Sequence, residues 1–201
     1  MFTLYTVEQV YGVNKMADAQ GGLRARLIDA AIVLLDRDGE AGMTLRALAK
    51  ATGVSAMAPY RHFPDKAALL GAVAEAGFAE LAAALAEADG AESPRAALVA
   101  QGLAYFRFAQ RRPALFRMMF GGNPGCDPAT KEYGEAFAIL SRRVASLAGS
   151  DSGPATLAAW GVVHGLATLA LDGRVPAADG VVTAAMALVA DGIASAQPRD
   201  G

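Results

Sequence analysis

The chain has 201 residues, 54% of them hydrophobic, and a formal net charge of −2 at neutral pH. This length allows one large or two small domains with a substantial core. Its single cysteine excludes an internal disulfide framework and fits a reducing compartment. Every apolar run of the ~18–20 residues that a membrane span needs is interrupted by charge, glycine or proline. We therefore expect a cytoplasmic protein with no membrane partner.

Residues 1–20 lack the basic start and apolar core of a signal peptide and have no clear helical period. We expect them to form an N-terminal extension without fixed structure, in which Met16 is an alternative translation start. The first helix is predicted over 23–38, where apolar residues recur on one face. Gly39 and Gly42 bracket its end.

Residues 44–63 predict a helix, a four-residue turn and a second short helix. Thr44 is a good cap for the first of these helices, and Gly53 stands where the chain must turn sharply. Ser55 can cap the second helix, predicted over 55–62. A helix-turn-helix unit of this spacing places its second helix in the major groove of DNA.

The side chains of this unit suggest two kinds of DNA contact. Arg61 and Arg46 can bind guanine edges, whereas Ala56 and Met57 can contact only thymine methyl groups. The other polar side chains suit phosphates, which fix the register without reading sequence. The predicted DNA-binding residues are Thr44, Arg46, Ser55, Ala56, Met57, Tyr60, Arg61, His62 and Lys66.

Bulk charge gives this prediction no support. Residues 21–75 carry seven basic and six acidic side chains, and residues 76–201 carry ten basic and twelve acidic ones. A solvated helical surface explains this composition equally well. The prediction of DNA binding therefore depends on the geometry of the motif.

Helices are predicted through the rest of the chain, separated by loops rich in glycine and proline. Ser93-Pro94, for example, is a cap followed by a first-turn proline. The predicted ranges are 65–89, 93–112, 114–120, 129–148, 155–172 and 179–197. Together they give an all-α protein of about nine helices.

Two segments resemble one family. Residues 24–75 resemble the TetR/AcrR family of bacterial transcriptional regulators, with matches at Thr44, Leu48, Ala49, Gly53, Val54, Ser55, Tyr60, His62, Phe63, Lys66 and Leu69-Leu70. Residues 160–174, with Trp160, His164 and Gly165, resemble the Trp-His-Gly class of C-terminal domains in that family. The resemblance implies a helix-turn-helix DNA-binding domain over 21–68 and a ligand-binding and dimerisation domain over 69–201.

An aromatic and methionine cluster in the second half can be either simple core or the wall of a ligand cavity. His164, four residues after Trp160, can likewise line a pocket or pack in the core. The family resemblance favours a cavity. Its predicted residues are Phe106, Phe116, Met119, Phe120, Phe137, Trp160 and His164.

We expect the last two helices to form a homodimer, because their small and aliphatic side chains suit close helix packing. The predicted interface residues are Leu157, Val162, Leu169, Val182, Met186, Val189 and Ile193.

The predicted function is a ligand-responsive repressor that binds a palindromic operator as a dimer and is released by a small apolar molecule. The same scaffold acting as an activator, or without a ligand, is the first alternative. A helical enzyme is the second, but the sequence lacks a paired acid and base, a phosphate loop and a metal cluster. We therefore predict no enzymatic activity, no cofactor and no metal.

Overall fold

The computed structural model describes residues 22–122, 131–148 and 152–196, and every regular element in these ranges is helical. The predicted extension 1–20 lies outside the described residues. The elements are α2 (Leu23–Gly42), α3 (Leu45–Thr52), η1 (Pro59–Arg61), α4 (Lys66–Ala88), α5 (Pro94–Arg111), α6 (Pro113–Phe120), α7 (Lys131–Ala148), α8 (Gly153–Leu171) and α9 (Asp179–Ser195). The all-α prediction is confirmed.

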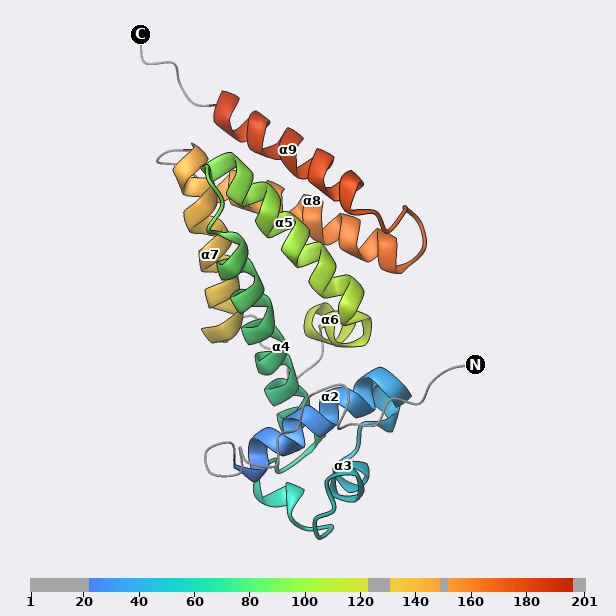
Figure 1. Ribbon diagram of the computed structural model, residues 1–201. Coiled ribbons are helices and arrows are strands. Elements are labelled where there is room, and N and C mark those ends of the chain that lie inside the picture. The colour runs from blue at the N-terminus through green and yellow to red at the C-terminus, as the bar shows by residue number, and fades with distance from the viewer. Residues whose placement is uncertain (1–21, 123–130, 149–151, 197–201) are drawn as a thin grey trace.

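The helices form two groups that α4 connects (Figure 1). One group holds α2, α3 and η1, and the other holds α5, α7, α8 and α9. Helix α4 begins in the first group and packs along α5 and α7 in the second. Helix α6 lies at the junction, where it contacts α2 as well as α4. The core is one continuous cluster that extends from Leu27 on α2 to Ile193 on α9.

Helix starts follow the predicted local chemistry. At three of them a side-chain oxygen accepts a hydrogen bond from the backbone N–H three residues later: Thr44 before α3, Asp65 before α4 and Ser93 before α5. At the end of α2, Gly39 leaves helical geometry with a φ of 68°, which explains why the regular helix stops near the predicted residue.

The predicted regular helix over 55–62 is wrong. Residues 56–58 form turns, and Pro59–Arg61 winds as a single turn of 3-10 helix. The N–H of Ala58 donates to the carbonyl oxygen of Ser55 (2.9 Å), a bond that spans three residues instead of four. Pro59 has no N–H to donate to Ser55, so the α-helical bond cannot form there and the segment tightens.

Helices α4 and α8 are long and apolar enough to cross a membrane by length and composition, a property that the interruptions in the sequence had hidden. In α4, 56% of the most apolar 18-residue segment is buried, as expected for the central helix of the core. In α8 the share is 22%, because many of its residues are half-buried or exposed.

Candidate DNA-binding surface and ligand cavity

The helix-turn-helix unit turns at Gly53, whose φ of 69° lies in the left-handed region that glycine adopts without strain. The N–H of the next residue, Val54, donates to the carbonyl oxygen of Ala49 (3.1 Å) and closes the end of α3. This turn leads the chain into residues 55–62, where η1 packs back against α3.

Eight of the nine predicted DNA-binding residues are exposed, and Lys66 is half-buried. The largest apolar areas among them belong to Met57 and Tyr60, which are 65% and 46% exposed. The neighbouring Pro59 and Phe63 are buried and hold the segment against the core. The predicted residues are therefore accessible on the surface of the helix-turn-helix unit.

Lys66 has a second role that the sequence did not reveal. Its Nζ donates to the carbonyl oxygen of Glu40 (2.8 Å), which ties the start of α4 to the end of α2. Arg24 also supports the unit, because its guanidinium lies 5.6 Å from the centre of the Phe63 ring. Both contacts join segments distant in sequence, and no local pattern could predict them.

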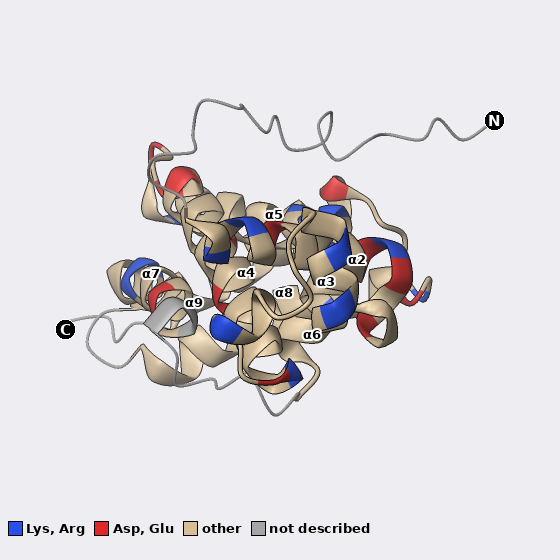
Figure 2. Ribbon diagram, turned by 90° about the horizontal axis from the view of Figure 1, so that it is seen from below, with Lys and Arg blue, Asp and Glu red and all other residues tan. Residues whose placement is uncertain are grey.

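Charge on this end of the molecule is mixed. Figure 2 views the molecule from the end that carries α3 and shows Lys and Arg segments interleaved with Asp and Glu segments. Within the described part of the chain, five exposed basic side chains of the unit form no ion pair: Arg24, Arg26, Arg46, Lys50 and Arg61. These cations are available to phosphates even though the overall charge is close to balanced.

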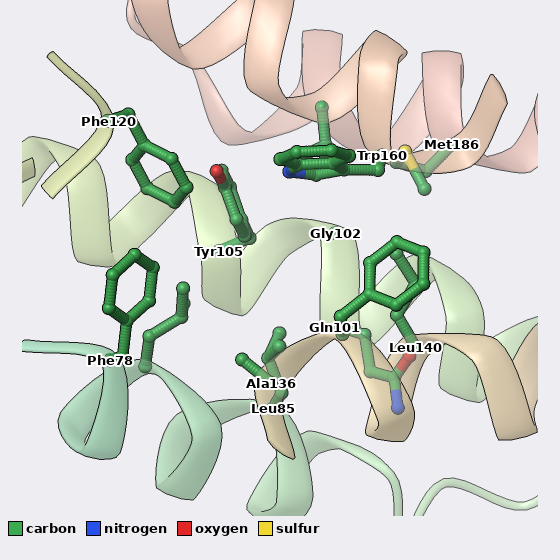
Figure 3. Close-up of a pocket in the computed structure, with 13 residues that line it drawn as sticks. Phe78, Leu85, Gln101, Gly102, Tyr105, Phe120, Ala136, Leu140, Trp160 and Met186 are labelled. Atoms are coloured by element: carbon green, nitrogen blue, oxygen red, sulfur yellow. The ribbon is translucent and has the colours of Figure 1, made fainter. Parts of the chain in front are cut away.

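A small apolar cavity of about 40 Å³ lies inside the second group of helices. Helices α4, α5, α6, α7, α8 and α9 all contribute to its wall (Figure 3). Three of the predicted pocket residues line it: Phe120, Phe137 and Trp160. Pockets for drug-sized ligands usually measure ~300–1,000 Å³, so this conformation is nearly closed.

One polar side chain in this wall was missed by the sequence analysis. Gln101 on α5 is 1% exposed, and its Nε2 donates to Oδ1 of Asp89 (2.7 Å). The same carboxylate oxygen accepts from Nε of Arg143 (2.7 Å). The Oε1 atom of Gln101 is buried without a hydrogen-bond partner. Its position four residues before Tyr105, on the apolar face of a helix, was the signal that could have identified it.

His164 lies beside this cavity but not in its wall. It lines a second, more open cavity of about 270 Å³ together with Phe116 and Phe120, so Phe120 borders both spaces. Its Nδ1 is hydrogen-bonded to the Tyr105 hydroxyl (2.8 Å), and burial lowers the pKa of the imidazole. The neutral ring is therefore favoured, surrounded by the rings of Phe116, Phe120 and Trp160.

The remaining two predicted pocket residues lie in the core. Phe106 and Met119 are 2% and 4% exposed and line neither of the two cavities. The sulfur of Met119 instead lies 2.6 Å from the position that a Cβ would occupy at Gly77. This close approach of α6 to α4 uses Met119 as a packing residue.

Large exposed apolar side chains occur in two parts of the molecule. Six large ones are exposed among the described residues: Met57, Tyr60, Leu157, Leu169, Val181 and Leu188. The first two belong to the helix-turn-helix unit, and the other four lie on α8 and α9. Leu188, at 75%, is the most exposed of them. The last four make up the exposed large apolar surface of α8 and α9.

Three predicted interface residues do not belong to this surface. Val182, Met186 and Ile193 on α9 are buried within their own chain. Val162 and Val189 are half-buried, and Leu157 and Leu169 are exposed. Both faces of α9 are apolar, so the sequence does not indicate which face the chain itself covers, and the dimer interface stays a prediction.

The helix-turn-helix unit and the helices behind it both match known families. Residues 27–73 match the bacterial regulatory proteins of the tetR family, and residues 98–192 match the tetracyclin repressor-like C-terminal domain. The chain belongs to the TetR family. As a TetR-family protein it is a DNA-binding transcriptional regulator and not an enzyme. Its membership of the Trp-His-Gly class remains a prediction.

Solved structures agree with this assignment. A protein of unknown function from Rhodococcus sp. RHA1 is 34% identical, with a TM-score of 0.77 over 90% of this chain and 100% of that one. The transcriptional regulator SCO7222, a TetR from Streptomyces coelicolor, is 25% identical, with a TM-score of 0.71 over 86% and 97%. A TetR/AcrR-family regulator from Thermobifida fusca YX-ER1 shares the fold at 24% identity, with a TM-score of 0.63 over 84% and 97%. No curated protein matches the sequence.

Proposed function

We propose that this TetR-family regulator is a cytoplasmic, ligand-responsive repressor that binds a palindromic operator as a homodimer. The observation that carries the proposal is the continuity of α4. Its first turn is tied to the DNA-binding unit through Lys66 and Glu40, and its later turns line the apolar cavity through Phe78, Leu81 and Leu85. A molecule that enters the cavity therefore acts on the helix that positions the DNA-binding unit.

In this proposal the exposed segment 55–62 enters the major groove as a turn rather than as a full helix. Arg61 and Arg46 contact guanine edges, and Met57 contacts a thymine methyl group. The Thr44 hydroxyl already accepts from Ala47 N (3.1 Å) and can still donate its proton to a phosphate. Lys66 has further N–H groups beside the one that binds Glu40, so it too can reach a phosphate.

The homodimer forms through the outward faces of α8 and α9. Leu157 and Leu169 remain from the prediction, with Leu188 and Val181 added, because all four are exposed and apolar. An isologous contact across a two-fold axis relates the 55–62 segments of the two protomers by symmetry. Such an arrangement requires a palindromic operator. Leu188→Arg should therefore shift the protein to monomer in sedimentation and weaken operator binding. Ala83→Arg, on the exposed side of α4, is the control and should leave both unchanged.

Ligand binding requires a change of conformation, because a cavity of about 40 Å³ is too small for most organic molecules. A ligand therefore selects a more open state, and release of DNA follows if that state no longer fits both half-sites. The walls are predominantly apolar, so we expect a mostly apolar molecule.

Footprinting on the promoter region adjacent to its own gene, followed by a release assay, tests the proposal. Apolar compounds should reduce protection of a palindromic site, while strongly cationic compounds should not. An operator without two-fold symmetry, or release by cationic compounds alone, would contradict it. A protected site upstream of the promoter that raises transcription would instead identify an activator, the alternative that the same scaffold allows.

A further inference from the structure

Gln101 lines a predominantly apolar wall and carries a buried hydrogen-bond acceptor without a partner. Its side chain is 1% exposed and lines the cavity on α5, on the same helix as Tyr105 (Figure 3). Nε2 is bound to Asp89, and Oε1 has no partner. A buried acceptor left unpaired costs free energy, so it favours any molecule that brings a donor to it.

The orientation of this amide is fixed by its neighbours. Oδ1 of Asp89 accepts from both Nε2 of Gln101 and Nε of Arg143, each at 2.7 Å. Turning the amide around would place Oε1 against the carboxylate, two acceptors with no proton between them. The acceptor is therefore held away from Asp89.

The wall has two other polar groups, the Tyr105 hydroxyl and the indole N–H of Trp160. Tyr105, one turn further along α5, shares its hydroxyl with Nδ1 of His164 (2.8 Å). The rest of the wall is aromatic and aliphatic. A charged ligand group would be buried against these apolar side chains, which is costly. A carboxylate would in addition face the Gln101 oxygen, which accepts hydrogen bonds and cannot donate one. Arg143 is paired with Asp89, which leaves little attraction for a cation.

We propose that the cavity selects a neutral apolar molecule with a single hydrogen-bond donor, such as a hydroxyl group, which donates to Oε1 of Gln101. This inference rests on the proposed ligand-responsive function and names the chemical class of the ligand. It assigns the orienting contact to Gln101, since His164 lines the second cavity and not this one.

Four one-ring compounds of the same shape provide the test: benzyl alcohol, toluene, benzoate and benzylammonium. Trp160 is the one tryptophan of the chain and lines the cavity, so its fluorescence reports binding without DNA. Wild type should bind benzyl alcohol and toluene, and should bind benzoate and benzylammonium at least about tenfold more weakly than benzyl alcohol. Benzyl alcohol loses more hydration than toluene when it binds, so its Kd is not compared with that of toluene directly. The ratio of the two Kd values is instead compared between wild type and each variant.

In Gln101→Leu, the ratio of the benzyl alcohol Kd to the toluene Kd should rise about tenfold, which corresponds to about 1.4 kcal/mol. Toluene binding by the variant shows that the cavity is intact, and Gln101→Met serves if the leucine variant does not fold. Gln110→Leu is the matched control. Gln110 lies on the same helix and also has a buried unpaired amide atom, but it does not line the cavity, so the ratio should not change.

Three results would overturn the inference: the same ratio in Gln101→Leu as in wild type, benzoate binding as tight as that of benzyl alcohol, or no binding of any of the four compounds. Operator release is measured separately. Benzyl alcohol binding that depends on Gln101, in a protein whose operator no compound releases, would leave the chemistry of the cavity intact and contradict the proposed repressor function.

Discussion

At the scale of single residues, the DNA-binding surface separates into side chains that can read bases and side chains that can only anchor. Arg61 and Arg46 carry planar guanidinium groups that are exposed and form no ion pair within the described part of the chain. Tyr60 and Met57 present large exposed areas with at most one polar atom each. Sequence readout and affinity should therefore be separable by mutation.

Arg61→Ala should reduce the preference for operator over random DNA by ~1–3 kcal/mol, because a bidentate guanine contact discriminates between bases. Tyr60→Phe, which keeps the ring and removes the hydroxyl, should weaken operator and random DNA alike. Titrations on both DNAs at one salt concentration measure the two effects. Arg37→Ala is the control, since this guanidinium is paired with Asp38. An unchanged preference in both Arg61→Ala and Arg46→Ala would mean that DNA shape or the apolar Ala56 and Met57 supply the readout.

His164 should make stability depend on pH. Burial lowers its pKa below the ordinary value of 6.5, so the unfolded chain takes up a proton at a higher pH than the folded one. The stabilisation is complete above about pH 6.5 and is lost as pH falls from there through the folded pKa. In urea unfolding at about pH 7.5 and about pH 5.5, wild type should therefore lose more stability than His164→Phe. An equal loss would show that other groups, common to both proteins, cause the whole change.

Residue chemistry was predictable where it is local. The capping role of Thr44 follows from its place before an apolar helical pattern, and the structure shows its side chain accepting from Ala47 N. The ties of Lys66 to Glu40 and of Gln101 to Asp89 were not predictable, because they depend on how helices cross. Tertiary contacts of this kind leave no periodic signal in a single sequence.

At the scale of elements, the sharp turn after α3 depends on the backbone of Gly53. Its φ is 69°, and no atom lies within 4 Å of the position that a Cβ would take. Gly53→Ala should therefore cost roughly 1–2 kcal/mol of unfolding free energy through backbone strain and not through a clash. Gly53→Asn should cost less, since asparagine tolerates this region. Urea unfolding compares the three proteins, and equal stability of the alanine variant would show that the turn relaxes.

The presence of the helices could be predicted from their capping residues and from the period of their apolar residues. Each α-helix of the described residues was predicted within a few residues of its bounds. The failure over 55–62 has a local cause. Pro59 removes the donor that an α-helix would need, and the prediction gave more weight to the Ser55 cap and the spacing of the motif. The interface on α9 stays a prediction, because a helix that is apolar on all sides does not reveal its buried face.

At the scale of the whole molecule, α4 is not the single connection between the two groups of helices. Arg112, between α5 and α6, lies 3.6 Å from a carboxylate oxygen of Asp36 on α2 and 3.5 Å from one of Glu80 on α4. Helix α6, which follows it, contacts both of these helices and carries Phe120 into the cavity wall. A change of the cavity can therefore reach the DNA-binding unit along α4 and through α6.

Arg112→Met tests the second route, since methionine keeps an apolar stem and removes the charge. The Arg112 side chain is 20% exposed and bridges α2 and α4, so its loss should uncouple their movements. We expect nearly unchanged operator affinity without ligand, but a ligand effect on that affinity that is smaller by roughly 0.5–2 kcal/mol. Because coupling is reciprocal, operator should also reduce ligand affinity less in the variant than in wild type. Both quantities follow from titrations of a releasing compound with and without operator.

Arg95→Met is the control, because it removes an exposed ion pair with Asp191 on α9, away from the DNA-binding unit. Release by the same ligand concentration in Arg112→Met and wild type would assign the coupling to α4.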